Sequence, residues 1–245
     1  MRPFVLEVCA ETVESARAAL CGGAKRIELC SALSEGGLTP SYAAIQRARS
    51  LEGLVLHVLI RPRGGDFIYD DEEVETMAED IRVIRELGAD GIVIGCLTPD
   101  GDINIKQCNR LMKEASEMNV TFHRAFDQCR DPFKTLDEIV SIGCNRLLTS
   151  GQAPTAEQGV TLIRQLVERA DDRLTILPGS GVNPSNAKFI IEATGVHELH
   201  ASARSSFPSS MKFHLDGVTM GASDNSLVRM ETDPCKVRAI LDAVK

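Results

Sequence analysis

A short glycine-led pattern recurs four times along the chain, and it constrains the fold more than any other feature. Each copy continues with a small or apolar residue, two mostly polar positions and a strand-like run, and the copies begin at Gly23, Gly88, Gly143 and Gly195. Glycine suits the left-handed position that ends a helix, so each copy is typical of a helix end followed by a strand. The copies start 65, 55 and 52 residues apart. Because one βα unit of an α/β barrel takes roughly 30 residues, each interval has room for two units.

Four further strand candidates lie between these copies and bring the total to eight. They are predicted at Phe4–Cys9, Leu54–Ile60, Val120–Arg124 and Leu174–Leu177. Segments between the strands repeat apolar residues at helical spacing. The three clearest sets are Val74, Met77, Ile81 and Ile84; Ile105, Cys108, Met112 and Ala115; and Phe133, Leu136 and Val140. Alternating strands and helices imply a parallel sheet, and eight units predict a single (β/α)8 barrel of the TIM type. An open doubly wound sheet is the alternative, although no GxGxxG follows the first strand.

The first residues of two helices and the form of the C-terminal tail can also be predicted. Asp131-Pro132 and Asn183-Pro184 each resemble an N-cap followed by proline at the first helical position. The eight strands fall within residues 4–204, and the barrel pattern stops there. The extension 205–245 contains a Ser/Pro-rich loop at Ser205–Ser210, a polar stretch at Gly217–Asn225 and a helix expected at Asp233–Val244. It is too short for a core of its own, so residues 1–245 are expected to form one domain with the tail packed on the barrel.

Composition narrows the class of protein. The chain has 245 residues, a net charge of −8 and 43% apolar residues, which is typical of a globular protein and disfavours nucleic-acid binding. No apolar run reaches the ~18 residues that a membrane span needs. Met1–Phe4 leads directly into a strand without the apolar region of a signal peptide, so we expect a cytoplasmic protein. In that compartment the eight cysteines would be reduced thiols.

The first two strands share a Glu-x-Cys pattern, in a place where a barrel is normally filled with apolar side chains. Glu7 and Cys9 are two residues apart and therefore share one face of the first strand, as do Glu28 and Cys30 on the second. If the two registers match, the cysteines form one pair and the carboxylates form another, one layer deeper. Free cysteine is also a common core residue, so both cysteines have a purely structural interpretation as well.

The two glutamates need partners, because an ionised carboxylate inside a barrel is costly unless it is paired. The candidate counter-charges follow the third and fifth strands, and they are Arg61, Arg63, His123 and Arg124. A buried ion network that only stabilises the barrel is the alternative to a functional role for these carboxylates.

Polar residues also follow the third and fifth strands. Arg61-Pro62-Arg63-Gly64-Gly65-Asp66 would suit an anionic ligand, although a salt-bridged loop is the alternative. His123 could act in acid–base chemistry or bind a metal, and Asp127 could orient it or balance an arginine. His57 lies inside a strand and is interpreted as a core residue.

The last three strands end in small residues. In many barrels the loops after strands seven and eight bind phosphate through backbone N–H groups, and an ordinary tight turn is the alternative. The full set of predicted anion- or substrate-binding residues is Arg61, Arg63, Asp66, Arg124, Ser150, Gly179, Ser180, Gly181, Ser202, Arg204 and Lys212.

Several longer strings resemble the CutC family of copper homeostasis proteins. They include Glu7–Cys9, Arg26–Ser31, Ser34–Gly37, Ile60–Phe67, Thr121–Asp127, Leu148–Gly151, Ser202–Arg204 and Met211–Phe213. The resemblance implies a TIM barrel, a cytoplasmic location and a role in copper tolerance or trafficking. It also implies that Cys9 and Cys30 are the Cu(I) ligands, which agrees with the preference of soft thiolates for Cu(I).

Two functions from different classes therefore remain open. The first is a cytoplasmic copper-binding protein that uses Cys9 and Cys30, with copper, as Cu(I), the expected cofactor. The second is a barrel enzyme for a small anionic or phosphorylated metabolite, in which Glu7, Glu28, His123 and Asp127 are the candidate catalytic residues. A thiol sensor that oxidises Cys9 and Cys30 is a third hypothesis. The expected partners are copper and a small anion, without nucleic acid or membrane, and the chain is expected to form a homodimer or larger assembly.

Overall fold

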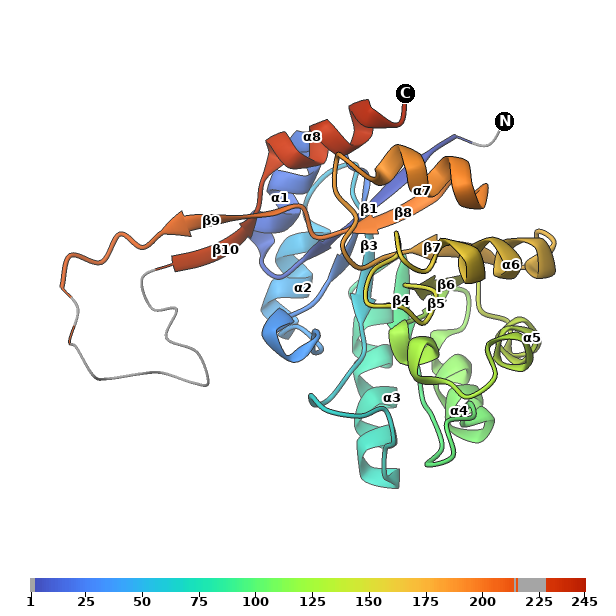
Figure 1. The fold of residues 1–245 in the computed structure, drawn as a ribbon. Coiled ribbons are helices and arrows are strands. Elements are labelled where there is room, and N and C mark those ends of the chain that lie inside the picture. The colour runs from blue at the N-terminus through green and yellow to red at the C-terminus, as the bar shows by residue number, and fades with distance from the viewer. Residues whose placement is uncertain (1–2, 214, 216–227) are drawn as a thin grey trace.

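Eight parallel strands form the centre of the molecule (Figure 1). The computed structural model describes residues 3–213, 215 and 228–245. The barrel strands are β1 (Val5–Ala10), β2 (Arg26–Leu29), β3 (Val55–Leu59), β4 (Gly91–Ile94), β5 (Asn119–Phe122), β6 (Arg146–Thr149), β7 (Thr175–Pro178) and β8 (Glu198–Ala201). Neighbours in sequence pair from β1 to β7, and β8 pairs with β1. No ladder joins β7 to β8 in the described part of the chain, so the barrel is nearly closed. The predicted barrel is confirmed, and the doubly wound alternative is wrong.

Helices cover the outside of the barrel, and the repeated glycines end them as predicted. The helices that follow β1 to β7 are α1 (Val13–Gly22), α2 (Tyr42–Arg49), α3 (Asp71–Glu86), α4 (Ile105–Ala115), α5 (Pro132–Ile142), α6 (Val160–Ala170) and α7 (Ala187–Thr194), with short 3-10 turns η1 (Leu33–Glu35) and η2 (Arg124–Gln128). Gly23, Gly143 and Gly195 are left-handed C-caps with φ of 104°, 94° and 76°. Among the described residues, no helix combines the length and the apolar character that crossing a membrane requires.

One of the two predicted helix starts is confirmed. The side chain of Asp131 accepts hydrogen bonds from the N–H groups of Phe133 and Lys134, and Pro132 opens α5. The prediction for Asn183-Pro184 is wrong, because α7 begins only at Ala187. The Asn183 side chain instead accepts a hydrogen bond from the N–H of Ser185, so the chain makes an extra turn before the helix.

The C-terminal tail is partly packed on the barrel and partly extended. Strands β9 (Arg204–Pro208) and β10 (Val228–Thr232) form an antiparallel ribbon that projects from the barrel (Figure 1), which the sequence did not predict. The predicted closing helix is confirmed as α8 (Pro234–Ala243), which packs on α1. Exposed apolar side chains gather on and beyond the ribbon, at Phe207, Met211, Phe213, Leu215, Val228 and Met230. The predicted polar stretch Gly217–Asn225 lies outside the described residues, and association into a dimer or larger assembly stays a prediction.

The interior of the barrel is unusually polar, and several of its buried polar side chains belong to the candidate site. Leucine, isoleucine and valine fill the layer between strands and helices, whereas the barrel axis holds buried charged and histidine side chains. A small apolar cluster of Cys9, Cys30, Leu59 and Val93 lies inside, apart from the main core. Two glycines on or next to β4 make room for rings on the adjacent strands. A Cβ atom at Gly91 would lie 2.7 Å from the His57 ring, and one at Gly95 would lie 2.5 Å from the His123 ring.

Candidate functional site

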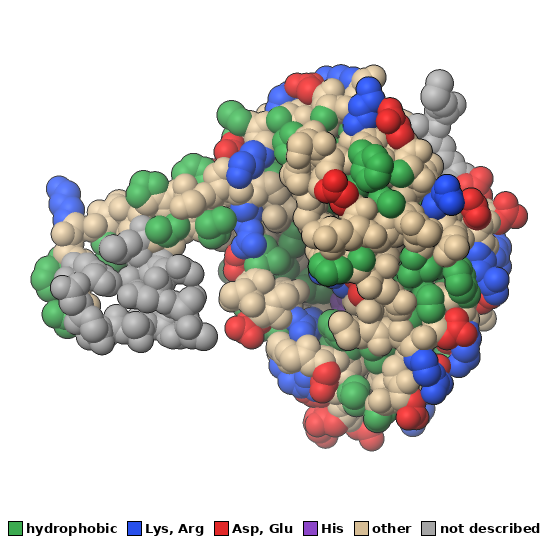
Figure 2. All heavy atoms as spheres, in the orientation of Figure 1, with side chains coloured by type: hydrophobic (Ala, Val, Ile, Leu, Met, Phe, Trp, Pro, Cys, Tyr) green, Lys and Arg blue, Asp and Glu red, His purple; other side chains and the backbone are tan. Residues whose placement is uncertain are grey.

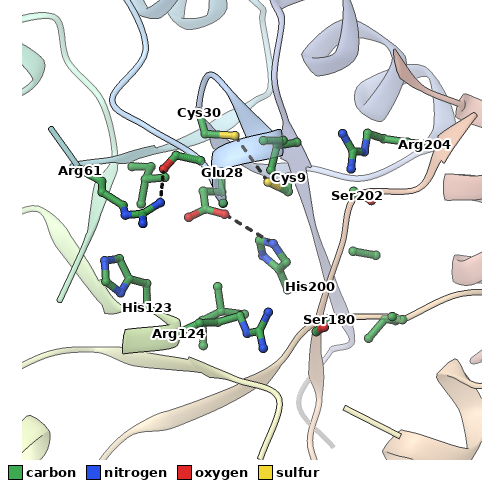
Figure 3. A pocket seen from close by; sticks show the side chains of 18 of the residues that line it. Cys9, Glu28, Cys30, Arg61, His123, Arg124, Ser180, His200, Ser202 and Arg204 are labelled. Carbon is green, nitrogen blue, oxygen red and sulfur yellow. Dashed lines mark hydrogen bonds and ion pairs between the residues drawn. The ribbon is translucent and has the colours of Figure 1, made fainter. Parts of the chain in front are cut away.

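A cavity of about 360 Å³ opens at the carboxyl ends of the barrel strands. Figure 2 shows a hollow on this face, and Figure 3 shows the side chains that surround it. Of the residues that the sequence predicted for a site, the lining contains Cys9, Glu28, Cys30, Arg61, His123, Arg124, Ser180, Gly181, Ser202 and Arg204. The remaining lining residues are Leu33, Gly36, Gly37, Leu59, Phe67, Leu148, Val182, His200 and Ala201. The structure therefore brings together most of the candidate residues from six different strand ends.

The two candidate copper ligands lie side by side. The Sγ atoms of Cys9 and Cys30 are 3.6 Å apart, and both side chains are buried. The condition of matched registers is not met, because the Cα partner of Cys9 is Glu28. Strands of a barrel are staggered along its wall, so Cys30 lies two residues further along than the partner of Cys9 and approaches Cys9 diagonally. The carboxylates do not pair either, since Glu7 lies opposite Arg26.

His200 on β8 joins this group, and the sequence interpretation missed it. Its Nδ1 is 2.9 Å from Glu7 Oε1. Its Nε2 is 3.4 Å from Glu28 Oε2, a contact that Figure 3 marks with a dashed line. A sulfur of Cys9, a carboxylate oxygen of Glu28 and a ring nitrogen of His200 all lie within 4.8 Å of one another. Burial acts to lower the pKa of His200, but hydrogen bonds to Cys9 and Glu7 and the charge of Glu28 raise it well above its ordinary value. His200 is therefore an imidazolium in this state.

Glu7 lies below the pocket in a buried ion network. It accepts a hydrogen bond from Arg26 at 2.7 Å, and Arg26 also pairs with Glu198. Burial acts to raise the pKa of Glu7, but the hydrogen bond with His200 and the charge of Arg26 hold this pKa far below its usual range. The predicted counter-charges for the glutamates (Arg61, Arg63, His123 and Arg124) are wrong, because Arg26 and His200 have this role. Burial raises the pKa of Glu28, which has the weaker contact with His200.

His123 contributes a neutral, buried donor to the pocket. Its Nδ1 accepts a hydrogen bond from the N–H of Ala125 at 3.1 Å, so the proton of the neutral ring is assigned to Nε2. Nε2 has no hydrogen-bond partner among the described residues. Burial, with the charge of Arg61, lowers the pKa of His123 to about 3. The ring packs against Phe67, with centroids 4.9 Å apart.

His123→Asn is expected to make the protein less sensitive to mild acid. A histidine whose folded pKa is about 3 binds its proton first in the unfolded chain, where the ordinary value is about 6.5. The contribution of His123 to the free energy of unfolding is therefore fully present above about pH 6.5. It is lost as the pH falls from there to 3, by up to ~1.4 kcal/mol per pH unit. Asparagine keeps an oxygen for the N–H of Ala125 but does not titrate. In urea unfolding, the variant should lose about 2 kcal/mol less than the wild type between pH 6.5 and 5.0. Equal losses would contradict the assignment.

The two arginines after β3 have different environments. Arg61 is 4% exposed and donates hydrogen bonds to the carbonyl groups of Glu35, Gly37 and Gly65. No carboxylate forms an ion pair with Arg61 in the described part of the chain. Arg63 turns away from the pocket and pairs with Glu73 and Asp66, so Arg63 and Asp66 form the salt-bridged loop of the alternative interpretation.

Asp127 acts as an anchor for the loops after β5 and β6. Its carboxylate accepts hydrogen bonds from Thr149 Oγ1 at 2.5 Å, from the N–H of Ser150 at 3.1 Å and from Arg124 Nε at 2.7 Å. It balances an arginine, which is one of its two predicted roles, and it forms no hydrogen bond with His123 in the described part of the chain. The buried Ser150 hydroxyl accepts from Arg124 Nη2 at 3.0 Å and so holds the same guanidinium.

Two other predicted residues lie outside the cavity lining. Gly179 lies behind the wall, where a Cβ atom would come within 2.6 Å of Leu148. Lys212 is exposed beyond β9 in the extended tail.

The family model named CutC matches residues 4–205. The chain belongs to the CutC family. A CutC family protein of Bacteroides thetaiotaomicron is 51% identical over 224 residues, which cover 91% of this chain and 90% of that one. A CutC family protein of Chromobacterium violaceum is 47% identical over 98% of both chains. The solved structure of a Streptococcus agalactiae CutC, named for copper homeostasis, has a TM-score of 0.78 and 34% identity over 81% of this chain and 98% of its own.

More distant structures support the fold alone. The thiamine phosphate pyrophosphorylase of Pyrococcus furiosus matches with a TM-score of 0.60 at 19% identity, covering 98% of this chain and 95% of that one. The shared architecture is the barrel, since a fold of this kind hosts many unrelated functions.

The residues that the sequence interpretation missed did leave a signal. Glu198 and His200 are two residues apart on β8, and Arg26 and Glu28 are two apart on β2, so each pair points into the barrel. In this CutC family member, the rule that identified Glu7 and Cys9 would also have identified these pairs.

Proposed function

We propose that this CutC family member is a cytoplasmic protein that binds Cu(I) through the thiolates of Cys9 and Cys30, with copper as its cargo. The observation that carries the proposal is the contact between the two sulfur atoms, 3.6 Å apart at the floor of the open cavity. Thiolates are soft ligands that select Cu(I) over hard ions, and two of them are enough for a low-coordinate Cu(I) site. The family's name and the S. agalactiae relative both refer to copper homeostasis, which supports the same assignment.

The neighbouring charges fit this cargo. Two thiolates and one Cu(I) carry a net negative charge, which is costly to bury without compensation. The His200 imidazolium lies within reach of Cys9 and is fixed by Glu7. Glu28 is a hard oxygen ligand, so we assign it to orienting His200 rather than to binding Cu(I).

The thiol-sensor hypothesis receives less support. The contact with Cys30, burial and the charge of Glu28 together raise the pKa of Cys9 well above its ordinary value. Oxidation requires thiolate, so an unmetallated Cys9 would react slowly. A metal ion supplies the positive charge that removes this obstacle.

Removal of both thiols should weaken Cu(I) binding by more than the roughly 10- to 100-fold that loss of a single outer-shell partner of a metal ligand costs. The measurement is an anaerobic competition titration of Cu(I) against a chelating dye, with wild type and the Cys9→Ser/Cys30→Ser variant. Cys21 and Cys235 are exposed thiols outside the site, so Cys21→Ser/Cys235→Ser is the matched control and should bind like the wild type. Equal affinity in all three proteins would refute the proposal.

A further inference from the structure

We propose that the same cavity binds a small phosphate monoester, through a subsite at its rim that does not involve the cysteine pair. The inference goes beyond copper binding and rests on different residues. It assigns a use to the arginines, the turn after β7 and His123, none of which a Cu(I) site requires.

The charge of the cavity is the first argument. The chain as a whole has a net charge of −8, yet three arginines line this cavity (Arg61, Arg124 and Arg204). The one lining carboxylate, Glu28, is directed at the His200 ring, with Oε2 3.4 Å from Nε2. Arg61 is buried without a carboxylate partner among the described residues. Such an arrangement attracts an anion, because a cavity lined by one sign of charge concentrates the field.

Arg124 is held in position for a ligand. Asp127 fixes its Nε and the Ser150 hydroxyl fixes its Nη2, at 2.7 and 3.0 Å. These contacts leave Nη1 available on a guanidinium that cannot rotate freely, so little side-chain entropy is lost on binding. Arg204 lies on the other side of the cavity (Figure 3), and among the residues that the structure describes its side chain forms a single loose ion pair, with Glu11 at 3.7 Å.

The turn after β7 supplies backbone donors. Ser180 and Gly181 have φ of 78° and 72°, and serine is uncommon in this left-handed region. Two hydrogen bonds hold the turn there, from Ser180 Oγ to the Pro154 carbonyl and from the N–H of Ala156 to the Ser180 carbonyl, both 3.0 Å. The backbone N–H groups of Ser180, Gly181 and Val182 find no acceptor within the described ranges. Free N–H groups of this kind are the usual partners of phosphate oxygens.

His123 is the independent observation that points to a ligand. Its side chain is 5% exposed, it lines the cavity, and its Nε2–H lacks an acceptor among the described residues. A buried donor without a partner is destabilising, and a ligand oxygen would remove that cost. His123 and Arg61 both line the cavity, so a ligand oxygen that accepts from Nε2 would also lie near the charge of Arg61.

The donors together select the ligand class. A phosphate group has three terminal oxygens and accepts from several directions, which suits two arginines and a row of N–H groups better than a planar carboxylate does. A cavity of about 360 Å³ is at the small end for ligand sites, so the ester is a compact polar molecule of a few carbons.

The test is calorimetric titration of reduced, metal-free protein with inorganic phosphate, with glycerol 3-phosphate and with glycerol. We expect binding of glycerol 3-phosphate, weaker binding of phosphate and none of glycerol. Arg124→Gln should weaken the phosphate compounds roughly tenfold or more, because it removes a charged hydrogen bond. Arg130→Gln is the matched control, since Arg130 is an exposed arginine outside the cavity lining that pairs with Asp102.

Two further variants separate this proposal from copper binding and from misfolding. Cys9→Ser/Cys30→Ser should keep the affinity for glycerol 3-phosphate, and Arg124→Gln should keep the affinity for Cu(I). If Arg124→Gln is unstable, Arg204→Gln gives the same test, with the exposed Arg229→Gln as its control. Absence of binding to the wild type, or equal affinities in the arginine variants and their controls, would overturn the proposal.

Discussion

Replacement of Glu7 by glutamine is expected to lower the free energy of unfolding by about 3–5 kcal/mol, because it breaks a buried ion pair from one side. Glu7 is 1% exposed and contacts Arg26 at 2.7 Å and His200 at 2.9 Å. Both cations would stay inside the barrel after the substitution. Arg26 would keep Glu198, and His200 would keep the hydrogen bond with Cys9 and the longer contact with Glu28.

Urea unfolding at pH 7 measures this effect. Glu14→Gln is the control, because Glu14 is a 74% exposed carboxylate paired with Arg17 on the surface, and its loss should cost less than about 1 kcal/mol. Arg26→Gln and the double variant Glu7→Gln/Arg26→Gln complete a cycle. The double variant should lose less free energy of unfolding than the two single variants together. It removes both charges of the Glu7–Arg26 pair, so neither charge is left buried without the other. A loss below about 1 kcal/mol for Glu7→Gln would contradict the buried-network interpretation.

Gly159→Ala is the second substitution with a large expected effect. A Cβ atom at Gly159 would lie 1.9 Å from the carbonyl oxygen of Ser150, which belongs to the backbone and cannot rotate away. Gly159 has φ of −90°, a value that alanine adopts without strain, so the cost arises from the contact alone. Overpacking of this kind costs about 3 kcal/mol or more when backbone must shift. The shifted loop carries Ser150, which holds Arg124, so phosphate affinity should fall as well.

The control is Gly53→Ala, at a glycine with open space around it and φ of 77°. There the backbone conformation alone opposes alanine, at a cost of about 1–2 kcal/mol. Thermal unfolding and titration with glycerol 3-phosphate measure both consequences. Wild-type affinity in a folded Gly159→Ala protein would show that the loop after β6 does not position Arg124.

The fold could be predicted because its signals are local. A glycine that ends a helix and the strand that follows it lie within a few residues of each other. The spacing of the four glycine-led copies left room for two strands in each interval and so predicted eight strands. The ribbon of β9 and β10 was not predicted, because its two strands pair across residues 209–227, a stretch much longer than the usual hairpin loop. The extra turn before α7 depended on a side-chain hydrogen bond of Asn183, which competes with capping.

The site was predicted only where strand alternation is sufficient. Alternation placed Cys9 and Cys30 on the inner face, and their thiols do meet. It could not give the stagger between strands. The predicted counter-charges of Glu7 and Glu28 were therefore residues near the carboxyl ends of the third and fifth strands, whereas the actual partners, Arg26 and His200, lie within β2 and β8. Loop arginines are ambiguous for another reason, because Arg61 and Arg63 are two residues apart and yet point to different surroundings.

The two glycines at the ends of β4, Gly91 and Gly95, have a consequence for how this barrel can change over time. Gly95 leaves the space that the His123 ring fills, as Gly91 does for His57. Positions 95 and 123 thus share one volume across neighbouring strands, and residue 95 cannot enlarge while residue 123 is a histidine. A lineage that enlarged residue 95 would have to shrink residue 123 in the same step, and it would lose the buried donor with it. The histidines therefore keep these two glycines in place, although neither glycine lines the cavity.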